Sequence, residues 1–169
     1  MKVLLTGAAG GMGQESLKQM AADHGKYEII ALDLDNESSR KRLQPYEGNS
    51  RIRIMLGDLT DASFVENAVQ GCDLILHVAA CVSPAADYYP KKAMEVNYGG
   101  TRNLIEAIKK LKQDDTTRFV YNWCPECERK SWNYGARAKV DPFFAQVWNP
   151  LHDPDEMREY PKKVTELDI

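Results

Sequence analysis

The sequence has 169 residues and a mass of 19.1 kDa, and 43% of its residues are apolar and 28% are charged. This composition predicts a single globular domain over residues 1–169 and excludes the disordered and fibrous classes. Its 22 basic and 25 acidic residues give a formal net charge of −3, which argues against nucleic acid as a partner.

No apolar run approaches the ~20 residues that a membrane-spanning helix needs. The brief apolar start stops at a glycine cluster, unlike a secretory signal. We therefore expect a cytoplasmic protein with no membrane partner, whose four cysteines stay reduced.

Short apolar runs alternate with helical patterns along the first 122 residues, which is typical of βαβ units on a parallel sheet. The runs that predict strands are Lys2–Thr6, Glu28–Asp33, Arg51–Leu56, Asp73–Val78 and Arg118–Tyr121. The sequence thus predicts an α/β fold, a Rossmann-like, doubly wound parallel sheet of about five strands in the order 3-2-1-4-5.

Three helices are expected between these strands. The first opens near Met12 and runs to about Asp23. A short one covers Ser63–Gln70, with Ser63 as its N-cap, and the longest covers Pro90–Lys112. After Asn122 the periodicity is lost, so residues 122–169 are expected to form an irregular tail or a truncated continuation, with a short charged helix over Asp155–Leu167.

A glycine cluster, residues 6–13 (TGAAGGMG), lies where the first strand ends and the first helix begins. Such a turn lets the backbone approach a pyrophosphate, and the helix N-terminus adds amide donors and a partial positive charge. A glycine-rich turn alone is weak evidence, because some are only turns. The residues expected at the pyrophosphate are Gly7, Gly10, Gly11, Met12 and Gly13.

Asp33 closes the second strand about 20 residues after Gly13, where a carboxylate accepts hydrogen bonds from the adenosine ribose. This carboxylate would repel a 2′-phosphate, which favours NAD over NADP. Arg40, Lys41 and Arg42 are near enough in sequence to blur the preference, but we expect them to form a solvated face. His77, at a strand end, is expected to be a hydrogen-bonded core residue and not a catalyst.

The spacing Gly7-x-x-Gly10-x-x-Gly13 resembles the glycine motif of the extended short-chain dehydrogenase/reductases, the NAD-dependent epimerase/dehydratase group. Residues 57–61 (GDLTD), 77–80 (HVAA) and 96–104 (VNYGGTRNL) resemble further motifs of that family in the same order. The resemblance covers residues 1–121. It implies a cofactor, NAD, and cofactor-binding roles for Asp58, Leu59, Ala79, Ala80 and Asn97.

The same resemblance implies hydride transfer on a small-molecule substrate, either a sugar nucleotide or a small hydroxyl or carbonyl compound. The family's chemistry uses a Ser or Thr after the fifth strand and a Tyr-x-x-x-Lys pair. The chain has instead residues 122–125 (NWCP). Its catalytic candidates are Tyr160 as acid/base and Lys163, three residues later, although Pro161 disfavours helical geometry at Tyr160.

Other readings of these patterns remain open. Tyr88 and Lys92 have the Tyr-x-x-x-Lys spacing but precede the fifth strand, so we interpret the match as chance. The pair Cys124 and Cys127 lacks the further ligands of a zinc site, and no metal is expected. The extended short-chain dehydrogenase/reductases are longer than this sequence and continue past the position that corresponds to Ile169. If the chain is truncated or is a degenerate paralogue, the alternative function is favoured, a catalytically inactive NAD-binding module. A homodimer is also left open.

Overall fold

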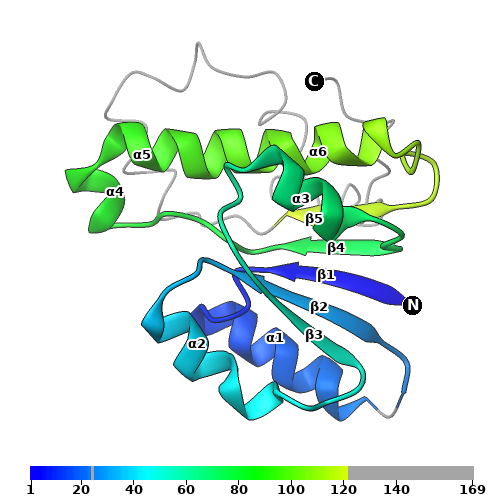
Figure 1. Cartoon of the computed structure of the whole chain (residues 1–169). Coiled ribbons are helices and arrows are strands. Elements are labelled where there is room, and N and C mark those ends of the chain that lie inside the picture. Colours follow the sequence, from blue (N-terminus) through cyan, green and yellow to red (C-terminus); the bar gives the residue numbers. More distant parts are fainter. Residues whose placement is uncertain (24, 122–169) are drawn as a thin grey trace, which may run out of the picture.

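The structure is a computed structural model that describes residues 1–23 and 25–121. In this part of the chain, five parallel strands form one sheet in the order β3-β2-β1-β4-β5, as Figure 1 shows. The predicted fold class and strand order are confirmed. The strands are β1 (Lys2–Thr6), β2 (Glu28–Asp33), β3 (Ile52–Leu56), β4 (Leu74–His77) and β5 (Arg118–Tyr121).

Helices cover both faces of this sheet (Figure 1). One face carries α1 (Gly11–Ala22) and α2 (Glu37–Leu43), which is followed by the 3-10 turn η1 (Gln44–Tyr46). The other face carries α3 (Ala62–Val69) and α6 (Gly100–Lys110). The short helices α4 (Ala85–Tyr88) and α5 (Pro90–Met94) precede η2 (Glu95–Gly99), a π-helical turn that joins α5 to α6.

Three local predictions are wrong or incomplete. Ser63 is not the N-cap of α3, because the Asp61 carboxylate caps it by accepting from the amides of Ser63 and Phe64 at 2.9 and 3.1 Å. The expected long helix is interrupted by η2 and ends at Lys110, before Lys112 turns to a φ of 54°. Helix α2 was not predicted, and Asn36 caps it by accepting from the Ser39 amide at 2.9 Å.

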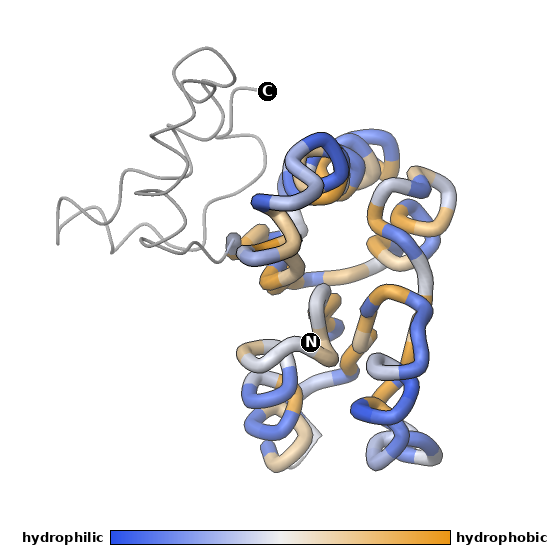
Figure 2. The backbone as a smooth tube through the Cα atoms, turned by 90° about the vertical axis from the view of Figure 1, so that its left-hand side faces the viewer, coloured by the Kyte–Doolittle hydropathy of each residue, from blue (hydrophilic) through white to orange (hydrophobic). Residues whose placement is uncertain are grey.

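The core has two layers, one on each face of the sheet, because side chains alternate along each strand. In β1, Leu4 packs in the layer under α3 and α6, whereas Leu5 packs in the layer under α1 and α2. Figure 2 shows the apolar strands enclosed by helices with polar outer faces. Buried strands that read as continuous apolar runs are typical of parallel sheets covered on both sides.

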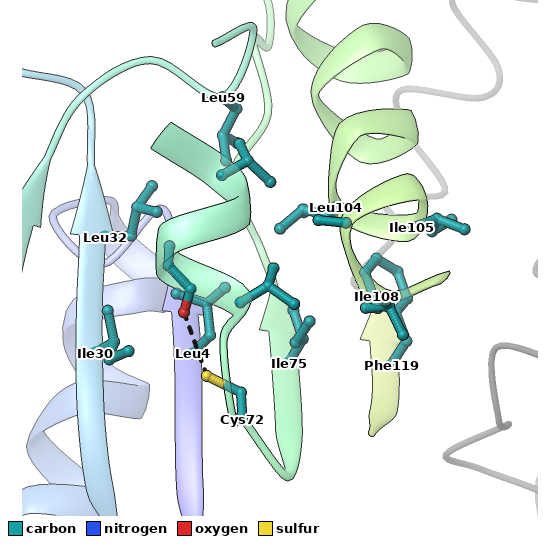
Figure 3. Close-up of a cluster of buried hydrophobic side chains, with 14 of the residues drawn as sticks. Leu4, Ile30, Leu32, Leu59, Cys72, Ile75, Leu104, Ile105, Ile108 and Phe119 are labelled. Carbon is teal, nitrogen blue, oxygen red and sulfur yellow. Dashed lines mark hydrogen bonds between the residues drawn. The ribbon is translucent and has the colours of Figure 1, made fainter. Parts of the chain in front are cut away.

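Figure 3 shows the first of these layers, in which side chains of α6 and β5 meet those of β1, β2 and β4. Cys72 lies at its edge and donates its thiol to the Ala68 carbonyl at 3.3 Å. Burial raises the pKa of the Cys72 thiol to about 11. A thiol that stays protonated is a packing residue and not a nucleophile.

Candidate functional site

The glycine loop follows β1 at the point where the strand order reverses, between β1 and β4. Gly7 has a φ of 71°, and a Cβ there would lie 2.8 Å from the backbone N and Cα of Ala79, just after β4. A Cβ on Gly13 would lie 1.9 Å from the Gly7 carbonyl oxygen. These two glycines are therefore required by the close approach of the loop to β4 and to helix α1.

The middle of the loop is open. Apart from the adjoining backbone, a Cβ at Gly10 would have one described atom within 4 Å, the Gly7 oxygen at 3.2 Å, and a Cβ at Gly11 would have none. Among the residues that the structure describes, no side chain caps the N-terminus of α1, and the first turn of this helix holds no acidic residue. Amides of a first helical turn need an acceptor. An exposed backbone followed by an uncapped helix N-terminus fits a phosphate group, so the residues present fit a dinucleotide.

Asp33, at the end of β2, lies against this loop. Its Oδ2 accepts from the Ala9 amide at 2.7 Å, while its Oδ1 accepts from the Leu34 amide at 2.8 Å and from Ser39 Oγ at 3.0 Å. A carboxylate has about four acceptor positions, and the contacts among the described residues use three, which leaves one that a ligand hydroxyl can use. The side chain expected at the ribose therefore also fixes the loop, a role that strand spacing alone does not reveal.

The three basic residues of α2 behave differently from one another. All three are exposed, as predicted, and Arg40 forms an ion pair with Asp35, with Nη2 2.6 Å from Oδ1. The prediction of a solvated face is nevertheless incomplete, because Arg42 Nη1 donates to the Ala9 carbonyl at 2.9 Å. Its guanidinium is thus held on the glycine loop.

His77, the last residue of β4, joins the loop to η2 through two buried hydroxyls. Thr101 Oγ1 donates its one proton to the Asn97 carbonyl at 2.6 Å, so His77 Nε2, 2.9 Å away, must donate to Thr101. His77 Nδ1 then accepts from Thr6 Oγ1 at 2.7 Å. Burial lowers the pKa of His77 to about 4, in agreement with this neutral tautomer and with the predicted core role.

Asn97 lies in η2, and its carboxamide holds the segment that follows β4. Its Oδ1 accepts from the Cys81 amide at 2.6 Å, and its Nδ2 donates to the Cys81 carbonyl at 3.0 Å. Two bonds to one residue fix the backbone immediately after Ala79 and Ala80. The structure therefore gives Asn97 a positioning role, and its direct contact with a cofactor stays a prediction.

Asp58 and Leu59 follow β3 at the same edge of the sheet. A hydrogen bond from the Thr60 amide to Asp58 Oδ1, 2.9 Å long, lowers the pKa of Asp58, and Lys92 Nζ lies 3.8 Å from its Oδ2. Leu59 is 6% exposed and packs in the core, so only its backbone is available to an adenine. Tyr88 is 76% exposed. No hydrogen bond joins it to Lys92, although the two described residues have the Tyr-x-x-x-Lys spacing.

Some predicted residues lie outside the described part of the chain. They include the catalytic candidates Tyr160 and Lys163, the cysteines Cys124 and Cys127, and the segment of residues 122–125 that follows β5. Four residues now found at the site were not predicted there, because their polar contacts depend on tertiary structure: Thr6, Ser39, Arg42 and Thr101.

Comparison with known proteins shows what this chain is similar to. A family model described as the 3-beta hydroxysteroid dehydrogenase/isomerase family matches residues 4–126. A protein of Methanocaldococcus jannaschii, named an uncharacterized membrane protein, MJ1061, is 33% identical over 119 residues, which cover 70% of this chain and 34% of that protein. In the described residues, no helix is both long and apolar enough to cross a bilayer.

Solved structures share the fold. Pen from Bacillus thuringiensis is 26% identical, with a TM-score of 0.61 over 71% of this chain and 36% of that one. The dTDP-glucose 4,6-dehydratase DesIV of Streptomyces venezuelae, solved with NAD bound, is 29% identical, with a TM-score of 0.57 over 66% of this chain and 37% of its own. A UDP-Glc/GlcNAc 4-epimerase of Campylobacter jejuni is 26% identical, with a TM-score of 0.59 over 71% and 36%. The chain spans about a third of the length of these relatives.

Proposed function

The chain belongs to the 3-beta hydroxysteroid dehydrogenase/isomerase family of extended short-chain dehydrogenase/reductases, and from this premise we propose that it binds NAD and takes part in NAD-dependent epimerase, dehydratase or dehydrogenase chemistry. The observation that carries the proposal is the open glycine loop. In the described part of the chain, no side chain stands over its backbone at Gly10 and Gly11, and no side chain caps the helix into which it leads. The Asp33 carboxylate accepts from its Ala9 amide.

In this proposal, each part of the dinucleotide is bound by a different group of residues. The glycine loop and the N-terminus of α1, residues 7–13, hold the pyrophosphate, while Asp33 accepts from the adenosine ribose. Asp58 and Leu59 lie at the adenine, and Ala79 and Ala80, fixed by Asn97, flank the middle of the cofactor. When bound, NAD supplies the hydride acceptor, and NADH the donor, of the reaction.

The substrate we propose is a sugar nucleotide, because two of the similar solved structures are named as enzymes of dTDP-glucose and of UDP-Glc/GlcNAc. Tyr160 would move a proton to or from a substrate oxygen, and Lys163 would lower the pKa of its phenol. We further propose that residues 1–169 form a single domain in a cytoplasmic protein, and that it assembles as a homodimer.

The test of the cofactor is a fluorescence titration of the whole chain with NADH. We expect saturable binding, and we expect Asp33→Ala to weaken it by about tenfold or more, because a charge-assisted hydrogen bond contributes about 1.5–3 kcal/mol. Asp35→Ala is the matched control, since Asp35 is paired with Arg40 and its side chain forms no hydrogen bond or ion pair with the glycine loop among the described residues. Unaltered binding by Asp33→Ala would refute the assignment of the ribose to this carboxylate.

The second candidate function is an NAD-binding module without catalytic activity. It is favoured by one specific observation, the absence of Ser or Thr in residues 122–125 (NWCP) after β5. A screen of sugar nucleotides and small carbonyl compounds with NAD and NADH distinguishes the two functions. If the chain is an enzyme, Tyr160→Phe should remove turnover and preserve NADH affinity; turnover that survives in Tyr160→Phe would exclude this tyrosine as the acid/base.

A further inference from the structure

On the adenosine side of the proposed cofactor site, one residue of the glycine loop, Ala9, is hydrogen-bonded to two side chains of opposite charge. The Ala9 amide donates to Asp33 Oδ2 at 2.7 Å, and the Ala9 carbonyl accepts from Arg42 Nη1 at 2.9 Å. Because both side chains bond to the backbone of the same residue, the carboxylate and the guanidinium lie on the same short stretch of the loop.

The guanidinium of Arg42 has hydrogen-bonding capacity to spare. Arginine has five N–H donors, and among the described residues the side chain of Arg42 uses one, on Ala9. The Arg42 backbone is also held to α1, because Gln14 Nε2 donates to its carbonyl at 3.3 Å. An exposed, positioned guanidinium with unused donors can bind a phosphate through two parallel hydrogen bonds.

The two neighbouring cations do not share this placement. Arg40 is bound by the Asp35 carboxylate, with Nη2 2.6 and 2.7 Å from its two oxygens. Lys41 is exposed and makes no hydrogen bond or ion pair with another described residue. Of the three positive charges on α2, Arg42 is therefore the one held against the glycine loop.

Resting on the proposed function, we infer that Arg42 is a second determinant of cofactor choice, placed to bind the 2′-phosphate of NADP once the charge of Asp33 is removed. In the wild-type chain the carboxylate repels that phosphate, so NAD is preferred. Two side chains with opposite effects are thus hydrogen-bonded to the same loop residue, Ala9. The Asp33 carboxylate excludes the 2′-phosphate, and the Arg42 guanidinium would bind it.

The experiment is a set of NADH and NADPH titrations of the whole chain. Asp33→Asn removes the charge with little change of shape, and we expect it to shift the ratio of the two dissociation constants towards NADPH by about tenfold, the value of one charge-assisted hydrogen bond. Adding Arg42→Ala should cancel this gain. Adding Arg40→Ala, which removes the same charge from the same helix, should preserve it.

The single variants of Arg42 and Arg40 test the inference even if the Asp33→Asn variant does not fold. In the wild-type background, Arg42→Ala should move the ratio several-fold further towards NADH, and Arg40→Ala should not. Equal ratios in Arg42→Ala and Arg40→Ala, in either background, overturn the inference. A folded wild-type chain that binds neither dinucleotide overturns the proposed function, and with it this inference, so the two failures are distinguishable.

Discussion

Gly13→Ala is expected to destabilise the folded chain by more than about 3 kcal/mol. The added Cβ would lie 1.9 Å from the Gly7 carbonyl oxygen and 2.7 Å from its carbonyl carbon, far inside van der Waals contact. Both are backbone atoms of a loop that is itself packed against Ala79, so neither can rotate away as a side chain would. Overpacking of a yielding core costs about 1–3 kcal/mol, and a backbone clash should cost more.

The measurement is urea unfolding of the wild-type chain and of two variants. Gly11→Ala is the matched control, because it places the same methyl group in the same turn of α1, where no described atom outside the adjoining backbone of the helix lies within 4 Å. We expect Gly11→Ala to be as stable as the wild type or up to about 1 kcal/mol more stable, since alanine favours a helix over glycine. Equal stability of Gly13→Ala and Gly11→Ala would show that α1 does not pack on the loop this closely.

Much of the fold could be predicted because its signals are local. The residues of β1, β2 and β5 were predicted to the residue, since each is a short apolar run between polar segments. Helix α2 was missed because its seven residues, ESSRKRL, contain a single apolar side chain. Its stability comes from the Asn36 cap and from burial of Leu43, and a periodicity of apolar residues detects neither.

The residues of the site could be predicted only at positions where a single physical requirement allows one residue type. The left-handed φ of Gly7 and the close contact at Gly13 are reasons of this kind, and both glycines follow from spacing. Sequence alone does not separate Arg42 from Arg40, because the three cations of α2 are consecutive in the chain. Which of them contacts Ala9 depends on how α2 lies beside the loop, and this is set by packing between segments 33 residues apart.

Acid should weaken the fold through His77, between pH 6.5 and about 4. The pKa of an unperturbed histidine is 6.5, and burial lowers that of His77 to about 4. Between these values the unfolded chain binds a proton that the folded chain does not, so the free energy of unfolding falls as the pH falls. At about 1.4 kcal/mol per pKa unit, the loss attributable to His77 approaches about 3 kcal/mol near pH 4.

The hydrogen bonds of His77 with Thr6 and Thr101 also predict that acid destabilises the fold. Protonated His77 would have to donate from both ring nitrogens, which reverses its bond with Thr6 Oγ1. That hydroxyl already accepts from the Ala79 amide at 3.3 Å; it would then accept from Nδ1 as well and lose Nδ1 as the acceptor of its own proton. Urea unfolding at pH 7 and pH 4.5 should therefore show a smaller loss of stability in His77→Gln, which removes the titrating group, than in the wild type. Thr101→Val is the control: it removes the hydroxyl that accepts from Nε2 but keeps the imidazole, so it should lower stability at both pH values. If His77→Gln and the wild type lose the same free energy on acidification, carboxylates account for the effect and His77 does not couple the proton to the fold.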